Sequence, residues 1–337
     1  MSARPKALIA LKPEANLHTF GPGQRERLES LVDLIRAAPV ELWDEPRVAD
    51  QLGEVEILIT GWGAPVIDRA VLAAAPRLRL IAHLAGSVKG LVDPSAWERG
   101  IVVTSGGAAN AQPVAEYTLG AILLFNKRAI RLRDLYRQER RSLKVERHRT
   151  PGIGNYRKTI GIIGASAIGR RVIELLGPFS FEIVLYDPYV SAEEAQRLGV
   201  RLTDLDTLVR ESDVVSIHAP ATPQTHHLID ARRLGLMRDH ALLINTARGS
   251  LVDQVALTEV LLSGRIEAVI DVTDPEPLPP DSPLYDLPNV FLTPHIAGSI
   301  GTEAYRLTEL ILNEIERFLA GRPLEHSVRG ELLERLA

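Results

Sequence analysis

The sequence has 337 residues, of which 45% are hydrophobic and 24% are charged, so a globular protein with about two domains of ordinary size is expected. Its formal net charge of −4 gives no general attraction to nucleic acid or to an anionic membrane, and neither is expected as a partner. The sequence contains no Cys, which excludes disulfides, thiolate metal ligands and thiol nucleophiles, and no metal site is expected.

The first residues, MSARPKALIALKPE, hold only a five-residue apolar run, which is too short for the apolar region of a signal peptide. Nowhere do about 18 apolar residues follow one another, as a membrane-spanning helix requires. A cytoplasmic protein is therefore expected.

Short apolar runs alternate with amphipathic segments of helical length along the whole chain. This pattern is typical of parallel sheets with crossover helices, in which strands are covered on both faces. The α/β class is therefore predicted, with candidate strands at 7–12, 56–60, 78–84, 101–104, 158–163, 181–186, 213–218, 241–246, 266–272 and 289–293.

Two long helical patterns, 112–137 and 302–320, enclose the block that holds a glycine motif, and Gly321 and Pro323 end the second pattern. We therefore predict a discontinuous first domain of residues 1–110 and 297–337, and a second domain of residues 111–296.

The segment 127–149 has ten Lys or Arg against three acidic residues. It is interpreted as a solvated helix with internal ion pairs rather than a polyanion site, because it has almost no aromatic side chains for base stacking.

The stretch GIIGASAIG (161–169) resembles a dinucleotide-binding motif between a predicted strand and a predicted helix. Its N–H groups and the positive end of the helix dipole suit a pyrophosphate, and the residues expected at the cofactor are Gly164, Ser166, Ala167, Ile168 and Gly169. Ser166 occupies the position of the usual middle glycine, so weakened or displaced cofactor binding is expected there. A tight turn that binds nothing is the alternative reading of this motif alone.

Asp187 ends the next predicted strand, 18 residues after Gly169. An acidic residue at about this distance binds the ribose hydroxyls of adenosine. Its charge would repel a 2′-phosphate, so NAD (NADH) is predicted in preference to NADP.

Polar motifs follow or end the later strands, at the sheet edge where ligands bind in this architecture. They are SIHAPATPQTHHLI (216–229), INTARGSLVD (244–253), VIDVTDPEPL (269–278) and NVFLTPHIAGS (289–299). In order and spacing, the chain from about residue 55 to 320 resembles the D-isomer-specific 2-hydroxyacid dehydrogenases. The resemblance implies two Rossmann-like, doubly wound domains: a discontinuous, flavodoxin-like substrate domain and an NAD-binding Rossmann domain.

The resemblance also implies an NAD-dependent dehydrogenase that interconverts a small D-2-hydroxy acid and its 2-oxo acid, in practice a reductase of glyoxylate or hydroxypyruvate type. Hydride transfer needs a carboxylate anchor, a proton donor and a bound cofactor. Arg248 matches the arginine that anchors the substrate carboxylate and also lies at the cofactor. His295 matches the acid/base beside the cofactor, and Glu276 matches the carboxylate that orients it.

Further cofactor contacts are implied by the same resemblance. Asp271, Thr246 and Ala247 match positions at the nicotinamide end of the cofactor. The remaining contacts are the segment under the cofactor and a residue near its phosphates, namely His218, Ala219, Pro220 and Thr225.

The loop that holds the substrate carboxylate in much of the family corresponds to LAGSVKGLVD (84–93), where the usual interior aspartate is absent. The resemblance places Gly86, Ser87, Val88 and Lys89 at the substrate. Lys89 is interpreted either as a second positive charge for the substrate or as a side chain that points to solvent. Trp62 stands where members with phosphorylated substrates present arginine, which favours a neutral or apolar substrate tail.

Other functions stay open. One alternative is an NAD(H)-binding sensor or corepressor-like protein with little turnover, and another is an enzyme similar to phosphite dehydrogenase, whose loop also carries lysine before glycine. A third reading is an enzyme of lapsed efficiency, whereas Glu276 disfavours formate dehydrogenase. Most members are dimers through the region after the first crossing helix, and the apolar face within 114–125 is consistent with a homodimer.

Overall fold

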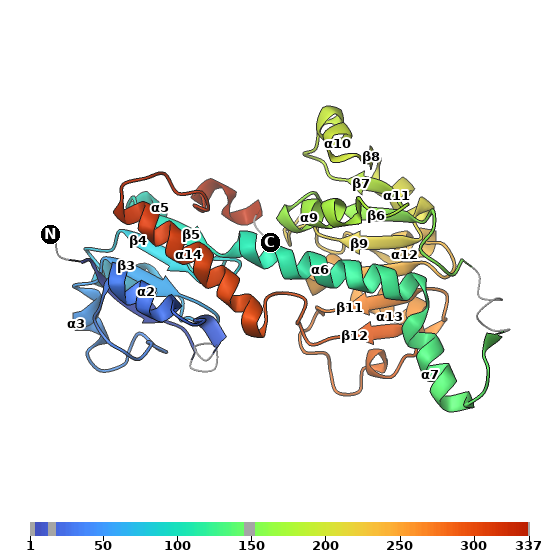
Figure 1. Cartoon of the computed structure of the whole chain (residues 1–337), viewed down its shortest axis with the longest axis horizontal. Coiled ribbons are helices and arrows are strands. Elements are labelled where there is room, and N and C mark those ends of the chain that lie inside the picture. Colours follow the sequence, from blue (N-terminus) through green and yellow to red (C-terminus); the bar gives the residue numbers. More distant parts are fainter. Residues whose placement is uncertain (1–3, 13–17, 145–151, 336–337) are drawn as a thin grey trace. The chain divides into compact units, whose positions relative to one another are not determined.

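The computed structural model describes residues 4–12, 18–144 and 152–335. The chain divides into two compact units: unit 1 is Met1–Asn110 with Ser299–Leu336, and unit 2 is Ala111–Gly298 (Figure 1).

Unit 1 is built around a parallel sheet with the strand order β2-β1-β3-β4-β5. Its strands are β1 (Lys6–Ala10), β2 (Asp33–Leu34), β3 (Ile57–Thr60), β4 (Leu80–His83) and β5 (Val102–Ser105). The helices are α2 (Gln24–Leu31), α3 (Val48–Leu52), α4 (Arg69–Ala74), α5 (Ser95–Glu98) and α14 (Ala304–Leu319). One face of the sheet packs against α2 and α14, and the other face forms a second core with α3, α4 and α5.

Unit 2 holds a seven-stranded parallel sheet with the order β12-β11-β10-β9-β6-β7-β8. Its strands are β6 (Thr159–Ile163), β7 (Glu182–Tyr186), β8 (Arg201–Leu202), β9 (Val214–Ile217), β10 (Leu242–Asn245), β11 (Glu267–Ile270) and β12 (Val290–Leu292). The helices α9 (Ala167–Leu176), α10 (Ala192–Leu198), α11 (Leu205–Glu211), α12 (Ala231–Leu236) and α13 (Gln254–Leu262) connect them. From β6 the chain adds β7 and β8 on one side, then crosses to β9 and adds β10, β11 and β12 on the other side. The order of the strands therefore reverses between β6 and β9, and this reversal is the topological switch point of the sheet.

The α/β class with doubly wound parallel sheets is thus confirmed. Every apolar run expected as a strand forms one, because strands buried on both faces have continuous hydrophobic sequences. The two-residue strands β2 and β8 were not expected, since each is too short to leave an apolar run.

The prediction of one helix over 112–137 is wrong, because the structure has α6 (Gly107–Asn126) and α7 (Ala129–Glu139). Arg128 separates them with a φ of 51°, a left-handed conformation that ends the first helix. Residues 145–149 of the basic segment lie outside the described residues. Within the described ranges, no helix combines the length and apolar character needed to cross a bilayer.

Candidate active site

The residues predicted at the cofactor all lie in unit 2, directly after strands of one parallel sheet. Following the sheet order, the motifs of His295, Asp271, Arg248, His218, Gly164 and Asp187 come after β12, β11, β10, β9, β6 and β7 respectively. Because the strands are parallel, these segments share one edge of the sheet, where ligands bind in this fold.

The outer glycines of the turn between β6 and α9 are required by close backbone contacts. Gly164 has a φ of 94°, and a Cβ there would lie 2.8 Å from the backbone nitrogen of Ala219. A Cβ at Gly169 would lie 2.0 Å from the carbonyl oxygen of Gly164. The turn is therefore pressed against the segment after β9, as a dinucleotide-binding turn must be.

Ser166 does not need the conformational freedom of glycine, because its φ is −64°. It is the N-cap of α9, and its Oγ accepts a hydrogen bond of 3.3 Å from the N–H of Gly169. Serine is among the favoured N-cap residues for this reason. Its presence at the middle position therefore has a structural explanation.

Asp187 is tied to the glycine turn. Its Oδ2 accepts a hydrogen bond of 2.7 Å from the N–H of Ala165, and its Oδ1 accepts one of 2.8 Å from the N–H of Tyr189. A carboxylate has about four acceptor sites, so both oxygens can still accept from ribose hydroxyls.

His218 is fully buried under the glycine turn. Burial lowers the pKa of His218 to about 3, so the imidazole is neutral. Its Nε2 lies 2.9 Å from Ser216 Oγ. Thr225 instead uses its hydroxyl proton within its own turn, donating to the carbonyl oxygen of Pro220 at 2.6 Å.

Arg248 follows β10 and begins a short 3₁₀ turn. Gly249 is required there, because a Cβ would lie 2.1 Å from the backbone of Thr273. This close approach brings Arg248 next to the loop that holds Glu276. Burial lowers the pKa of Arg248, and the negative charge of Glu276 counteracts this effect.

The carboxylate of Glu276 meets the imidazole of His295. The distance between His295 Nδ1 and Glu276 Oε1 is 2.7 Å, and both side chains are about half exposed. His295 has a left-handed backbone with a φ of 55°. A cavity of about 570 Å³ opens beside this pair, with Leu278, Tyr285 and Phe291 in its wall.

Asp271 holds the loop of His295 in place. Its buried carboxylate accepts hydrogen bonds from Thr293 Oγ1 at 2.6 Å, from the N–H of Ile296 at 2.8 Å and from the N–H of Ala297 at 2.9 Å. Its carbonyl oxygen accepts from the N–H of His295. Asp271 thus has a structural task that the motif alone did not indicate.

A tyrosine of α6 completes this network. The hydroxyl of Tyr117 lies 2.7 Å from Thr293 Oγ1, and burial together with the charge of Asp271 raises the pKa of Tyr117. Tyr117 and Thr293 were not predicted from the sequence. Their contact could have been predicted only from the arrangement of α6 and the strands, because the two residues are far apart in the chain.

In unit 1, Trp62 and the loop 84–93 follow the neighbouring strands β3 and β4. Trp62 is 38% exposed, and Gly86 and Ser87 are partly exposed. Lys89 is exposed, and its N–H donates to Ser87 Oγ at 3.3 Å. The side chain of Val88 is fully buried, so only its backbone can contact a substrate.

His83 anchors this loop and was not singled out from the sequence. Its Nδ1 lies 2.9 Å from Thr60 Oγ1, and its ring also bonds to the backbone of Ser87. Burial lowers the pKa of His83 to about 4, so the imidazole is neutral.

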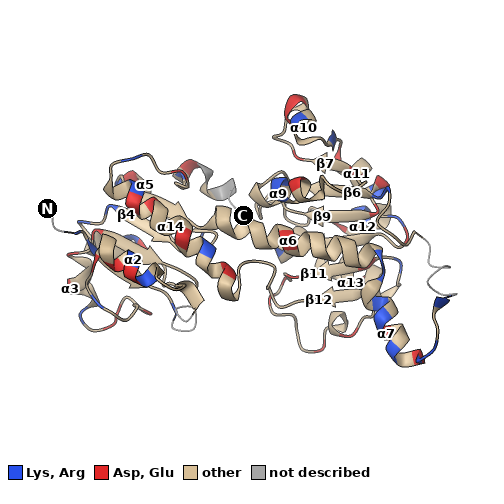
Figure 2. Ribbon diagram, in the orientation of Figure 1, with Lys and Arg blue, Asp and Glu red and all other residues tan. Residues whose placement is uncertain are grey.

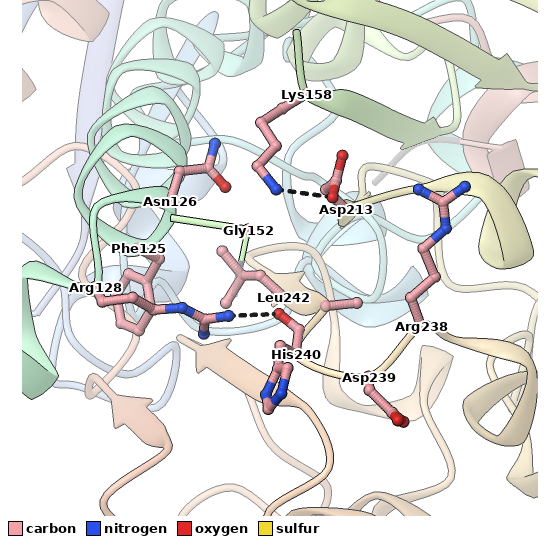
Figure 3. A pocket seen from close by; sticks show the side chains of 11 residues that line it. Phe125, Asn126, Arg128, Gly152, Lys158, Asp213, Arg238, Asp239, His240 and Leu242 are labelled. Carbon is pink, nitrogen blue, oxygen red and sulfur yellow. Dashed lines mark hydrogen bonds and ion pairs between the residues drawn. The ribbon is translucent and has the colours of Figure 1, made fainter. Parts of the chain in front are cut away.

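A second hollow, of about 110 Å³, lies at the amino edge of the sheet in unit 2 (Figure 3). Lys158 donates to Asp213 at 2.8 Å there, and Arg128 donates to the carbonyl oxygen of His240 at 2.9 Å. Arg128 also pairs with the buried Glu267. None of the predicted site residues lines this hollow, so the candidate active site remains at the carboxyl edge.

The carboxyl edge fits a dinucleotide. Ala167 and Ile168 lie in the first turn of α9, so their N–H groups have no acceptor within the helix and can bind phosphate. In the described part of the chain, the buried Thr246 Oγ1 and His218 Nδ1 have no hydrogen-bond partner. Buried polar atoms usually have one, so these atoms are consistent with a ligand at this edge.

Residues 119–297 match the family model described as D-isomer specific 2-hydroxyacid dehydrogenase, NAD binding domain. The chain is 37% identical over 270 residues to a glyoxylate reductase of Thermofilum pendens, and the match covers 80% of each chain. It is 35% identical over 269 residues to a D-3-phosphoglycerate dehydrogenase of Archaeoglobus fulgidus, covering 80% of this chain and 50% of that protein. The chain thus spans about half the length of the phosphoglycerate dehydrogenases that it matches. The apo structure of D-mandelate dehydrogenase from Rhodotorula graminis is 25% identical with a TM-score of 0.81, covering 97% of this chain and 98% of that one.

Proposed function

Because the chain belongs to the D-isomer-specific 2-hydroxyacid dehydrogenase family, we propose that it is an NAD-dependent oxidoreductase that interconverts a small D-2-hydroxy acid and its 2-oxo acid. The observation that carries the proposal is the contact of His295 with Glu276 beside Arg248, on the same sheet edge as the glycine turn. In this proposal unit 2 is the NAD-binding domain, and unit 1 is the substrate domain.

The roles follow from the chemistry of the side chains. NAD, when bound, accepts or supplies the hydride. Arg248 presents a permanently charged, planar fork that suits a carboxylate and an adjacent carbonyl oxygen. Glu276 accepts from Nδ1 of His295, which leaves Nε2 to deliver a proton to the carbonyl oxygen in reduction and to take it back in oxidation.

Reduction of a small 2-oxo acid of glyoxylate or hydroxypyruvate type is the direction we propose. The similarity to a glyoxylate reductase, over 80% of both chains, supports this substrate class. Trp62, partly exposed after β3, takes the place of an arginine that would favour a phosphorylated tail. A preference for NAD over NADP is proposed from the carboxylate of Asp187 beside the glycine turn.

We also propose that the protein forms a homodimer through α7. None of the residues of α7 is buried, although Leu132 and Leu135 are apolar, and the helix extends away from the sheet of unit 2 (Figure 1). Ile130, at its start, packs against the core of unit 2. The surface of α7 carries both arginines and acidic residues (Figure 2), and Arg133 pairs with Asp134. The apolar face within 114–125 is a weaker candidate than the sequence indicated, because Ile122 and Phe125 belong to the core of unit 2. Light scattering of the native protein and of a Leu132→Asp variant tests this interface.

The experiment that tests the function is the loss of NADH absorbance with glyoxylate, hydroxypyruvate, pyruvate and phenylpyruvate, beside a titration of NADH binding. Turnover of a 2-oxo acid supports the proposal, and the preferred tail size reports on Trp62. If NADH binds tightly but the protein neither turns over these acids nor oxidises phosphite, the proposal is contradicted and a binding protein is favoured. If the protein reduces NAD with phosphite, the alternative of an enzyme similar to phosphite dehydrogenase is supported.

A further inference from the structure

Ala165, the second residue of the glycine turn, is held by opposite charges. Its N–H donates to Asp187 Oδ2 at 2.7 Å, and its carbonyl oxygen accepts a hydrogen bond of 2.8 Å from Arg170 Nε. The carboxylate of Asp187 and the guanidinium of Arg170 are thus anchored to a single residue. This residue lies where the adenosine end of a dinucleotide meets the turn.

The guanidinium of Arg170 also pairs with an acid of the next helix. Its NH1 lies 2.8 Å from Oε1 of Glu194, which belongs to the first turn of α10. The side chains of Arg170 and Glu194 are 40% and 28% exposed, so solvent screens the pair. Ion pairs of this kind add little net stability, and the guanidinium can therefore change partners at small cost.

The neighbouring arginine has a different environment. Arg171 pairs with Glu174 one turn along α9, and its Nε donates to Gln112 of α6. It has no contact with Ala165 or Asp187 among the hydrogen bonds of the described residues. Arg171 is therefore a matched control of the same residue type on the same helix.

A guanidinium is the side chain best suited to a phosphate group, and an arginine close to the acidic residue of this motif accommodates the 2′-phosphate in NADP-binding proteins. We propose that Arg170 is a latent ligand for the 2′-phosphate of adenosine, and that Glu194 keeps it from this role. Exclusion of NADP then depends on Asp187, Arg170 and Glu194 together, not on Asp187 alone. The inference rests on the proposed function, because it takes the glycine turn as the cofactor site.

Binding of adenosine nucleotides tests this arrangement without requiring turnover. Calorimetry measures the affinities for 5′-ADP and for 2′,5′-ADP. The proteins are the native protein, the single variants Glu194→Gln and Arg171→Gln, and the double variant Asp187→Asn/Glu194→Gln with and without the further substitution Arg170→Gln. The native protein is expected to bind 5′-ADP at least about tenfold more tightly than 2′,5′-ADP, because Asp187 repels the additional phosphate.

Glu194→Gln is expected to strengthen binding of 2′,5′-ADP by roughly three- to tenfold and to leave 5′-ADP unchanged, because it frees one charge-assisted donor. Glu194 is partly exposed on α10 and does not touch the glycine turn. Adding Arg170→Gln to the double variant is expected to weaken binding of 2′,5′-ADP by about tenfold or more, and to weaken binding of 5′-ADP by much less, since this substitution also removes the hydrogen bond to the carbonyl oxygen of Ala165. Arg171→Gln is expected to change neither affinity.

Unchanged 2′,5′-ADP affinity on Glu194→Gln, or on adding Arg170→Gln to the double variant, overturns the role of Arg170. If Arg171→Gln weakens binding of 2′,5′-ADP as much as Arg170→Gln does, the role of Arg170 is also overturned, since general positive charge then explains the binding. Failure of the native protein to bind 5′-ADP at all contradicts the cofactor site itself, and thus the proposed function and this inference with it.

Discussion

Nδ1 of His295 lies 2.7 Å from Oε1 of Glu276, so one nitrogen of the imidazole is occupied by the carboxylate and the other is left for chemistry. The loops that carry the two residues follow the adjacent strands β12 and β11. A histidine held by an acid in this way has a fixed ring orientation, which an isolated surface histidine lacks.

Replacing His295 by glutamine is therefore expected to lower turnover by roughly 10²–10⁴, the usual contribution of a general acid/base, while NADH still binds. Steady-state kinetics and an NADH titration measure the two effects separately. His240→Gln is a matched control, because His240 also has a left-handed backbone, with a φ of 65°, but lies at the opposite sheet edge. Near-normal turnover of the His295 variant would refute the assignment.

The chain of hydrogen bonds from Tyr117 through Thr293 to Asp271 predicts an effect at a distance from the reacting atoms. Tyr117→Phe removes the 2.7 Å contact with Thr293 Oγ1 without changing the ring. Loss of one hydrogen bond worth about 1 kcal/mol is expected to lower kcat by roughly three- to tenfold, because the loop of His295 becomes less well fixed. The dissociation constant of NADH is expected to stay the same.

Tyr156→Phe supplies the control for this experiment, since Tyr156 is 71% exposed. A variant of Tyr117 whose kcat equals that of the control would show that the network does not position His295. A loss confined to the free energy of unfolding would assign Tyr117 a purely structural role.

The N-cap role of Ser166 leads to opposite expectations for two small substitutions. Ser166→Ala removes the oxygen that accepts from Gly169 N–H and is expected to lower the free energy of unfolding by about 1 kcal/mol, whereas Ser166→Gly costs only a few tenths. Because the hydroxyl of Ser166 is turned back onto the N–H of Gly169, neither variant is expected to bind NADH more tightly, against the weakened binding expected from the sequence. Urea denaturation and an NADH titration measure both quantities, and a tenfold gain in affinity for Ser166→Gly would show that the serine obstructs the cofactor.

Local patterns predicted the sheets because buried parallel strands have nearly continuous apolar sequences, as in ALIAL (7–11). The motifs also named the residues that the structure brings to one sheet edge. The break at Arg128 was not predictable from periodicity, and the partner of this residue, Glu267, lies far along the chain. Contacts of Asp271 and of Ala165 were missed for the same reason, since they are set by strand register and not by neighbouring residues.

The buried imidazole of His83 predicts a pH dependence of stability. Burial lowers the pKa of His83 to about 4, from the 6.5 of an exposed imidazole. Between these values the unfolded chain binds a proton at this residue and the folded chain does not, so the stabilisation is fully present above pH 6.5 and is lost as the pH falls toward 4. The loss is about 1.4 kcal/mol for each pH unit, or about 3 kcal/mol in total.

His83→Gln keeps groups that can bond to Thr60 and Ser87 but cannot take up a proton. Urea denaturation of this variant between pH 7 and pH 4.5 is therefore expected to show a shallower decline in the free energy of unfolding than the native protein, by about 1.4 kcal/mol for each pH unit. His218, whose pKa burial lowers to about 3, adds the same dependence to both proteins and cancels in the difference. If the free energies of unfolding of the native protein and the variant decline in parallel, His83 takes up its proton in the folded state, and the loop 84–93 is not held by a neutral imidazole.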